Sequence, residues 1–300
     1  MTDASPQLAS GMIGLGNMGG RIARRIRDGG LPIRGFDVSE EQAKGAGVDR
    51  EVSIATLAES VDVVFLSLPD SSVIESVVFD DGGLVSSLRS GQVVVDLSTA
   101  APSSSARIHD RLGEVGAAFL DAGISGGAAA AEKGALTLMV GGDASALERV
   151  RPILQTFSTG VHHMGAPGSG HTAKVLNNFL NGVSLAATAE VMVAAKQAGL
   201  DLAQFLEVVN TSSGVNFATL NRFPRIVEGD YLEGGLTSRL MAKDLRLYLE
   251  LLQEVAVTSF CGPACLGAFN LATALGYGDQ ISNRVVDAIG DVAGGVRIQQ

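Results

Sequence analysis

The segment that decides the fold is Met12-Ile-Gly14-Leu-Gly16-Asn-Met-Gly19, a G-x-G-x-x-G pattern. An apolar run precedes it and an amphipathic stretch at 21–28 follows it, so it predicts a strand, a tight turn and a helix. Gly14 would permit the turn, Gly16 would admit a pyrophosphate, and Gly19 would allow close helix–strand packing. Free N–H groups at the helix start would bind the phosphates. We therefore expect a dinucleotide to contact Gly14, Leu15, Gly16, Asn17, Met18 and Gly19.

The next predicted strand ends at Phe36-Asp37, and Ser39 and Glu40 follow without an arginine. A carboxylate at this place accepts hydrogen bonds from the ribose hydroxyls of NAD and repels the 2′-phosphate of NADP. Asp37 therefore predicts NAD as the cofactor, with NADP the second choice. Alternatively, Asp37 only caps a turn.

Outward from this segment, the first half of the chain alternates β-rich runs with amphipathic segments. This alternation indicates βαβ units and a doubly wound parallel sheet. Helical patterns without a convincing strand follow Gly170, and they begin with one long helix over 171–198. We expect an α/β Rossmann-type domain over 1–166 and an all-α domain over 167–300, with the long helix between them. The predicted strands are 11–15, 32–37, 61–68, 92–97, 118–121, 136–140 and 161–164, and examples of the later helices are 202–210, 217–227, 240–257 and 283–292.

The composition excludes several classes of protein. The net charge is −10 and no block of Lys or Arg occurs, which argues against nucleic-acid binding. Although 46% of the residues are hydrophobic, no stretch reaches the roughly 20 apolar residues that span a bilayer. We interpret the apolar excess as two cores and a subunit interface, and predict a homodimer or homotetramer.

The cysteines and histidines indicate no metal site. Cys261 and Cys265 lie beside Gly262-Pro263. We interpret them as reduced cysteines that serve as small apolar residues in a reducing compartment. The four histidines show no ligand spacing. The N-terminal residues are polar and acidic, unlike a signal peptide, so we expect a cytoplasmic protein.

Two motifs follow predicted strands at the carboxyl edge of the sheet, where doubly wound folds bind ligands. Asp96-Leu-Ser-Thr99 places Thr99 within possible reach of a nicotinamide, or it is an ordinary helix cap. Asp121-Ala-Gly-Ile-Ser125-Gly126-Gly127 exposes successive N–H groups that suit a carboxylate, or it is a flexible turn.

The long helix begins with Gly168-Ser-Gly170-His-Thr-Ala-Lys174-Val-Leu-Asn177-Asn178. Lys174 and Asn178 are four residues apart and share one helical face. Burial of Lys174 would lower its pKa toward the neutral range that a general acid/base needs. The alternative is a solvated surface lysine.

These motifs, in this order, resemble the β-hydroxyacid dehydrogenase family, which includes 3-hydroxyisobutyrate dehydrogenase and tartronate semialdehyde reductase. The resemblance covers nearly the whole chain and extends to Leu66-Ser-Leu-Pro69, Leu136–Gly142 and Lys243-Asp-Leu245. It implies that Lys174 is the catalytic acid/base and that a small anionic substrate is bound by Ser125, Gly126, Gly127 and Asn178. It also implies that Leu68, Pro69, Thr99 and Lys243 contact the cofactor, and that two lysines near one pocket repel each other.

The chain departs from the family pattern at Gly123-Ile124, where members usually have Pro-Val, and at Leu236, where many have phenylalanine. We expect Ile124 and Leu236 to alter the pocket wall, and therefore the substrate, but not the reaction. The predicted function is NAD-dependent hydride transfer from the hydroxyl carbon of a small hydroxy acid. The alternatives are an NADPH-dependent semialdehyde or imine reductase, and a catalytically silent NAD-binding module.

Overall fold

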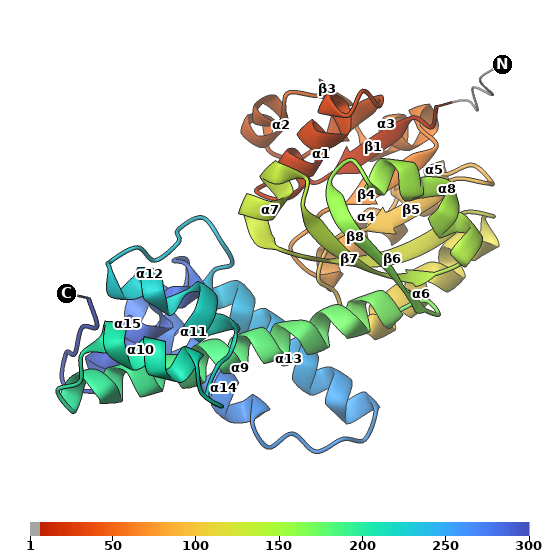
Figure 1. Cartoon of the computed structure of the whole chain (residues 1–300). Coiled ribbons are helices and arrows are strands. Elements are labelled where there is room, and N and C mark those ends of the chain that lie inside the picture. Colours follow the sequence, from red (N-terminus) through yellow and green to blue (C-terminus); the bar gives the residue numbers. More distant parts are fainter. Residues whose placement is uncertain (1–6, 300) are drawn as a thin grey trace. The chain divides into compact units, whose positions relative to one another are not determined.

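The computed structural model describes residues 7–299. The chain divides after Lys174 into two compact units (Figure 1). In the first unit, eight strands form one sheet in the order β3-β2-β1-β4-β5-β6-β7-β8. This confirms the predicted Rossmann-type sheet. The strands are β1 (Ser10–Ile13), β2 (Ile33–Phe36), β3 (Asp49–Arg50), β4 (Val63–Leu66), β5 (Val93–Asp96), β6 (Ala118–Ser125), β7 (Leu136–Gly142) and β8 (Ser158–Gly165).

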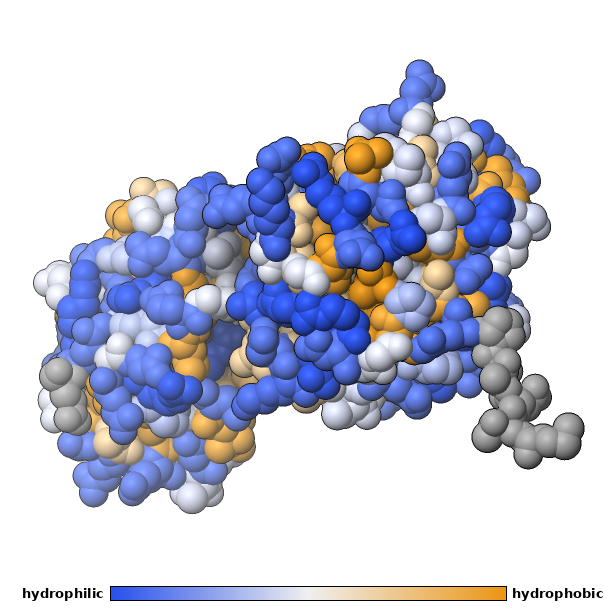
Figure 2. Space-filling model, turned by 90° about the horizontal axis from the view of Figure 1, so that it is seen from above, coloured by the Kyte–Doolittle hydropathy of each residue, from blue (hydrophilic) through white to orange (hydrophobic). Residues whose placement is uncertain are grey.

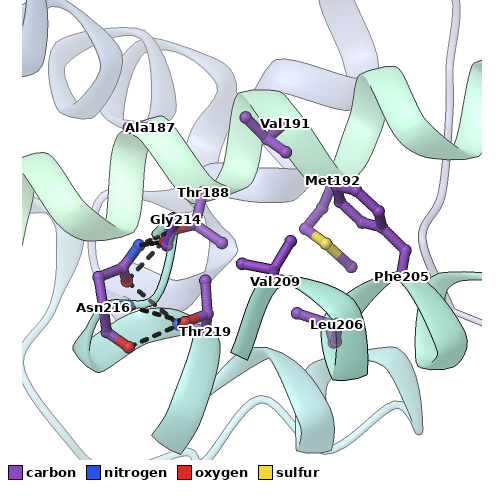
Figure 3. Close-up of a pocket in the computed structure, with 10 residues that line it drawn as sticks. All are labelled: Ala187, Thr188, Val191, Met192, Phe205, Leu206, Val209, Gly214, Asn216 and Thr219. Atoms are coloured by element: carbon purple, nitrogen blue, oxygen red, sulfur yellow. Dashed lines mark hydrogen bonds between the residues drawn. The ribbon is translucent and has the colours of Figure 1, made fainter. Parts of the chain in front are cut away.

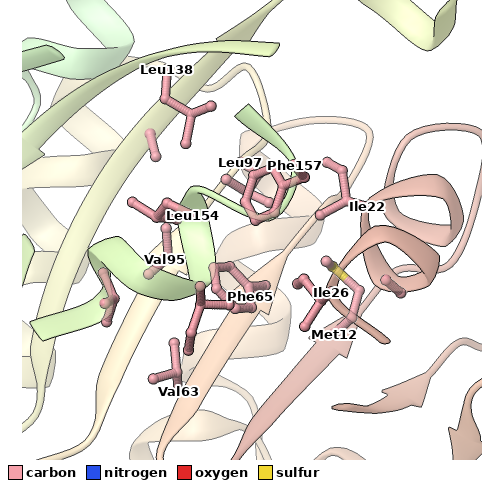
Figure 4. Close-up of a cluster of buried hydrophobic side chains, with 14 of the residues drawn as sticks. Met12, Ile22, Ile26, Val63, Phe65, Val95, Leu97, Leu138, Leu154 and Phe157 are labelled. Carbon is pink, nitrogen blue, oxygen red and sulfur yellow. The ribbon is translucent and has the colours of Figure 1, made fainter. Parts of the chain in front are cut away.

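Helices cover both faces of this sheet, so the strand residues that point to either side are buried. Met12 and Phe65 pack on one face in a cluster with helices α1 and α8 (Figure 4). Ile13 and Val64 pack on the other face with α3, α4, α5 and α6. The helices of the unit are α1 (Gly19–Asp28), α2 (Glu40–Ala46), α3 (Ile54–Ser60), α4 (Ser71–Phe79), α5 (Leu84–Ser87), α6 (Pro102–Glu114), α7 (Gly127–Lys133) and α8 (Ala144–Leu154).

The sheet is not parallel throughout, which corrects the prediction. Strand β7 runs antiparallel to β6, and β8 is parallel to β7. A parallel crossover needs a dozen or more residues, and only residues 126–135 separate the two strands. The segment after α7 therefore turns back along β6. Strand β3 was not predicted, because a two-residue edge strand carries no hydrophobic pattern.

The second unit is all helical, as predicted. It contains most of α9 (Ser169–Gln197), then α10 (Leu202–Asn210), α11 (Phe217–Asn221), α12 (Phe223–Val227), α13 (Ser238–Glu254), α14 (Gly262–Ala272), η1 (Thr273–Tyr277), η2 (Ser282–Arg284) and α15 (Val285–Val292). A core around Leu185, Met241 and Phe269 joins these helices. Phe179 of α9 stacks on Tyr248 of α13 with ring centroids 3.8 Å apart.

One helix prediction in this unit was wrong. The helix predicted over 217–227 breaks at Arg222, whose φ and ψ are −119° and −58°. Pro224 explains the break, because proline lacks an N–H donor and fits only the first turn of a new helix. Helix α14 was not among the predicted helices; Pro263 lies in its first turn, where proline is tolerated.

No helix within residues 7–299 is both long and apolar enough to cross a membrane. On the face seen in Figure 2, hydrophobic residues form patches that hydrophilic residues interrupt. Cys261 and Cys265 are both free thiols; Cys261 is exposed and Cys265 is buried.

Candidate active site

The turn after β1 has the geometry that a dinucleotide requires. Gly14 has φ of +90°, and a Cβ there would lie 2.3 Å from the carbonyl oxygen of Ser67. A Cβ on Gly19 would lie 2.0 Å from the carbonyl oxygen of Gly14, so helix α1 packs directly on the turn. A Cβ on Gly16, in contrast, would meet nothing within 4 Å. The open space at Gly16, beside the N-terminus of α1, fits a pyrophosphate.

Asp37 follows β2 and is fixed by the backbone on both sides. One carboxylate oxygen accepts a hydrogen bond from the N–H of Leu15 at 2.7 Å, and the other accepts one from the N–H of Ser39 at 2.8 Å. Each oxygen retains a lone pair, so the carboxylate can still accept bonds from ribose hydroxyls. Asp37 therefore does cap a turn, and this turn is the one that carries the glycine motif.

The loops after β4 and β5 are tied together at the carboxyl edge. The N–H of Leu68 donates to the hydroxyl of Ser98, and the N–H of Ala101 donates to the hydroxyl of Ser71, both at 2.9 Å. Leu68 and Pro69 in one loop, and Thr99 in the other, are thereby held along one edge of the sheet.

The Ser125-Gly126-Gly127 turn links the end of β6 to the start of α7. Gly126 and Gly127 have φ of +125° and +68°, values that side chains disfavour. A Cβ on Gly126 would lie 2.6 Å from Cβ of Ala130, so this position also lacks room. Ile124, the preceding residue, packs against the core of the first unit, and Leu236 packs against that of the second.

Lys174 is not a solvated surface lysine, because only 9% of it is exposed. Three glycines let the start of α9 contact the sheet closely. A Cβ on Gly123 would lie 2.4 Å from Cβ of Lys174, one on Gly170 would lie 2.3 Å from the carbonyl oxygen of Asp121, and one on Gly141 would lie 2.8 Å from the nitrogen of Gly170. Backbone packing therefore fixes where the lysine stem begins.

Asp121 of β6 caps the N-terminus of α9. It is fully buried on β6, and its two carboxylate oxygens accept hydrogen bonds from the N–H groups of Gly168 and His171, each at 2.7 Å. A carboxylate at a helix N-terminus also interacts favourably with the helix dipole. This contact anchors the helix three residues before Lys174.

A second buried acid, Asp96 at the end of β5, faces the same helix turn. Its Oδ2 lies 4.0 Å from Nε2 of His171, and neither atom has a hydrogen-bond partner among residues 7–299. The Nδ1 of His171 shares a hydrogen bond of 2.7 Å with the hydroxyl of Ser105 on α6. Burial raises the pKa of the Asp96 carboxyl, and the neighbouring carboxylate of Asp121 raises it further, while His171 and hydrogen bonds from Ser98 lower it.

In the second unit, Asn178, Asp244 and Lys243 form one polar chain. The amide of Asn178 donates to Oδ2 of buried Asp244 at 2.6 Å, and the ammonium of Lys243 lies 3.1 Å from Oδ1 of Asp244. The carboxylate of Asp244 thus offsets the positive charge of Lys243. One N–H of the Asn178 amide remains for another acceptor.

A cavity of about 240 Å³ lies elsewhere in the second unit, between α9 and α10 (Figure 3). Its wall is mostly apolar, with Met192, Phe205 and Leu206 on one side and the hydrogen-bonded group of Thr188, Asn216 and Thr219 on the other. It includes none of the predicted site residues. It also has no acid or base, so it is not the place of the chemistry.

The sequence prediction missed the residues that position the predicted ones. Asp121 and Asp244 lie within quoted motifs but were assigned no role, and Asp96 and His171 were not assigned one either. The sequence signal for these residues was an acidic side chain at the end of a buried strand or within the apolar face of a helix. A carboxylate buried at such a place needs a partner that binds it. In residues 7–299 no group of three His, Cys, Asp or Glu side chains could hold a metal ion.

Comparison with known proteins identifies the fold and the class of chemistry. The family model for the NAD-binding domain of 6-phosphogluconate dehydrogenase matches residues 9–165, and that for the NAD-binding region of NADP-dependent 3-hydroxyisobutyrate dehydrogenase matches residues 168–289. The NAD-dependent L-serine dehydrogenase of Pseudomonas aeruginosa is 37% identical, covering 89% of this chain and 93% of that protein. The 2-(hydroxymethyl)glutarate dehydrogenase of Eubacterium barkeri is 31% identical, covering 92% and 93%.

A solved structure gives the same result. Mycobacterium tuberculosis 3-hydroxyisobutyrate dehydrogenase with L-serine superposes with a TM-score of 0.84 at 28% identity, over 93% of this chain and 98% of that one. The relatives are named as dehydrogenases, and the L-serine dehydrogenase is NAD-dependent, so a catalytically silent module is not supported. This chain is an NAD-binding oxidoreductase that belongs to the β-hydroxyacid dehydrogenase family.

Proposed function

We propose that this enzyme oxidises the primary or secondary hydroxyl of a small hydroxy acid, with Lys174 as general acid/base. The observation that supports this most directly is the burial of Lys174 at a helix start that Asp121 and three glycines fix in place. With 9% of its surface exposed, Lys174 is shielded from bulk water, as a group that exchanges a proton with a bound substrate needs to be. In the oxidative direction the neutral amine takes the hydroxyl proton, and in reverse the ammonium returns it to the alkoxide.

Bound NAD supplies the hydride acceptor. We propose that Gly14, Leu15, Gly16, Asn17, Met18 and Gly19 hold its pyrophosphate, Asp37 its ribose, and Leu68, Pro69, Thr99 and Lys243 its nicotinamide half. The open space at Gly16 and the lone pairs of Asp37 support the first two assignments. These residues orient the cofactor, and the protein supplies the electrostatics.

We propose that the acid group of the substrate is bound by the N–H groups of Gly126 and Gly127, the hydroxyl of Ser125 and the amide of Asn178. Both glycines have positive φ, and successive backbone N–H groups in turn conformations can form anion-binding concavities. We also propose that residues 1–166 are the cofactor domain and 167–300 the substrate and assembly domain, and that the chain forms a homodimer or homotetramer. Its free thiols support a cytoplasmic location.

The direct experiment is a panel of acids assayed by NADH absorbance. It includes 3-hydroxyisobutyrate, L-serine, 2-(hydroxymethyl)glutarate, L-threonate and glycerate, with primary alcohols that lack the acid group as controls. We expect turnover with at least one acid and none with the alcohols. Equal turnover of an alcohol and its matched acid would contradict the proposal. Reduction of cyclic imines with NADPH in place of acid oxidation would support the rival imine reductase, which solved structures 20% identical or less support in fold alone.

A further inference from the structure

Arg222 occupies the break between α11 and α12 and is held by two asparagines from distant parts of the second unit. One terminal nitrogen donates to the amide oxygen of Asn283 at 2.8 Å, and the other donates to that of Asn181 at 2.9 Å. The guanidinium carbon lies 5.7 Å from the ring centre of Phe217, which is 59% exposed. The cation is thus held in one orientation beside an accessible aromatic ring.

No carboxylate of residues 7–299 lies within ion-pair distance of this guanidinium, although nearby Arg225 pairs with Asp230 and Arg284 pairs with Asp287 and Glu233. Burial lowers the pKa of Arg222 to about 10, and no acid raises it again. The side chain therefore remains charged at neutral pH, with only neutral amide partners. A partly buried charge of this kind is unfavourable until an anion joins it.

The location of Arg222 relates it to the proposed substrate site. Its partner Asn181 lies three residues after Asn178 on α9, so the two asparagines are neighbours on the helix surface, about 4.5 Å apart along its axis. Asn178 is one of the residues proposed to bind the substrate. The guanidinium has five N–H groups, of which the asparagines use two. Within residues 7–299 the Nε of Arg222 makes no hydrogen bond and is not among the fully buried atoms that lack a partner, so it can still donate to an acceptor.

We propose that Arg222 binds the distal carboxylate of a substrate that carries two acid groups, so that the preferred substrate is a dicarboxylic hydroxy acid. The inference rests on the proposed function, which assigns the proximal acid group to Ser125, Gly126, Gly127 and Asn178. A planar guanidinium matches a carboxylate with two parallel hydrogen bonds, which a lysine cannot reproduce. The ring of Phe217 would contact the methylene groups between the two acids.

The test compares matched substrates rather than one activity. Wild type, Arg222→Gln, Arg222→Lys and the control Arg225→Gln are assayed with 3-hydroxyisobutyrate, 2-(hydroxymethyl)succinate and 2-(hydroxymethyl)glutarate. Wild type should prefer one of the two dicarboxylates. Arg222→Gln should lower kcat/KM for that acid by about 10- to 150-fold, the worth of one charge-assisted hydrogen bond, and should change the monocarboxylate less than about threefold. Arg222→Lys should lie between, and Arg225→Gln should match wild type.

A purely structural role for Arg222 predicts an equal loss for all three acids, and that result would overturn the proposal. So would a wild type with no preference for a dicarboxylate. A binding measurement separates this proposal from the proposed function: calorimetric titration of glutarate into the NAD-loaded enzyme should show binding that Arg222→Gln abolishes. If no acid is oxidised but this binding is found, only the proposed function fails. If sulfate binds as tightly as glutarate, the site is a general anion site and the proposal is wrong.

Discussion

A Cβ atom on Gly123 would fall 2.4 Å from Cβ of Lys174, so β6 and α9 meet where only glycine fits. We expect Gly123→Ala to push the start of α9 away from the sheet. Because small displacements of a catalytic group can cost up to about 100-fold, kcat should fall at least about tenfold while NAD still binds. Steady-state kinetics and NAD titration measure both.

The matched control for this change is Gly113→Ala in α6, where a Cβ would meet nothing within 4 Å. It should leave kcat unchanged and stabilise the fold slightly, since alanine favours helix over glycine. Wild-type kinetics in Gly123→Ala would show that the close approach has no role in placing Lys174.

The proposed base is tested by Lys174→Ala. Loss of a general acid/base lowers kcat by about 10²–10⁴-fold, while the glycine turn should still bind NAD. Lys196→Ala, at the other end of the same helix, is the control and should behave as wild type. Near-normal turnover of Lys174→Ala would exclude the mechanism.

The carboxylate of Asp37 should set the preference for NAD. Wild type should have a higher kcat/KM with NAD than with NADP. Asp37→Ala should reduce this difference in kcat/KM, because the 2′-phosphate of NADP no longer meets a negative charge. Asp37 also holds the N–H groups of Leu15 and Ser39, so the variant should lose some thermal stability as well. A wild type whose kcat/KM with NADP equals or exceeds that with NAD would refute the assignment.

If Ser125, Gly126, Gly127 and Asn178 bind the acid group of the substrate, the effect of replacing them should depend on the charge of the substrate. Ser125→Ala and Asn178→Ala each remove one hydrogen bond to a charged group, worth about 10- to 150-fold in kcat/KM. The loss should appear with the acid substrate and be much smaller with its uncharged amide. Wild type and Ser125→Ala are therefore compared with both compounds. If wild type has the same kcat/KM with the amide as with the acid, these residues do not bind an acid group.

Asp96 should make the stability of the protein depend on pH. Its pKa is raised in the folded state, mainly by burial, so the folded protein binds a proton that the unfolded chain releases first. The free energy of unfolding should therefore fall as pH rises from the ordinary carboxyl pKa through the raised one. Asp96→Asn cannot ionise, so its stability relative to wild type should increase with pH across this range. His171 and Asp121 face this carboxyl and are unchanged in the variant.

Chemical denaturation at several pH values measures this difference. Asp143→Asn is a control of opposite sign, because hydrogen bonds from Ser145 and Ala146 lower the pKa of Asp143. Its contribution to stability is lost as pH falls, so its difference from wild type should shrink toward acid. A constant difference between Asp96→Asn and wild type at all pH values would show that Asp96 does not titrate on folding.

The sequence alone determined the parts of this protein that local patterns encode. The glycine spacing at Gly14, Gly16 and Gly19, the carboxylate at Asp37 and the succession of β-rich runs and amphipathic segments are all local features of the sequence, so the cofactor fold could be predicted. The order of the later motifs added the family. Periodicity also identified α9, because its apolar residues recur over many turns.

The tertiary structure decided what depends on contacts between distant segments. The direction of β7, the capping of α9 by Asp121 and the pairing of Asp244 with Asn178 involve residues far apart in the chain, and no local pattern encodes such contacts. The exposure of Lys174 is of the same kind, because a lysine beside apolar neighbours is compatible with either face of a helix. Only the packing of Gly123, Gly170 and Gly141 shows why this one is buried.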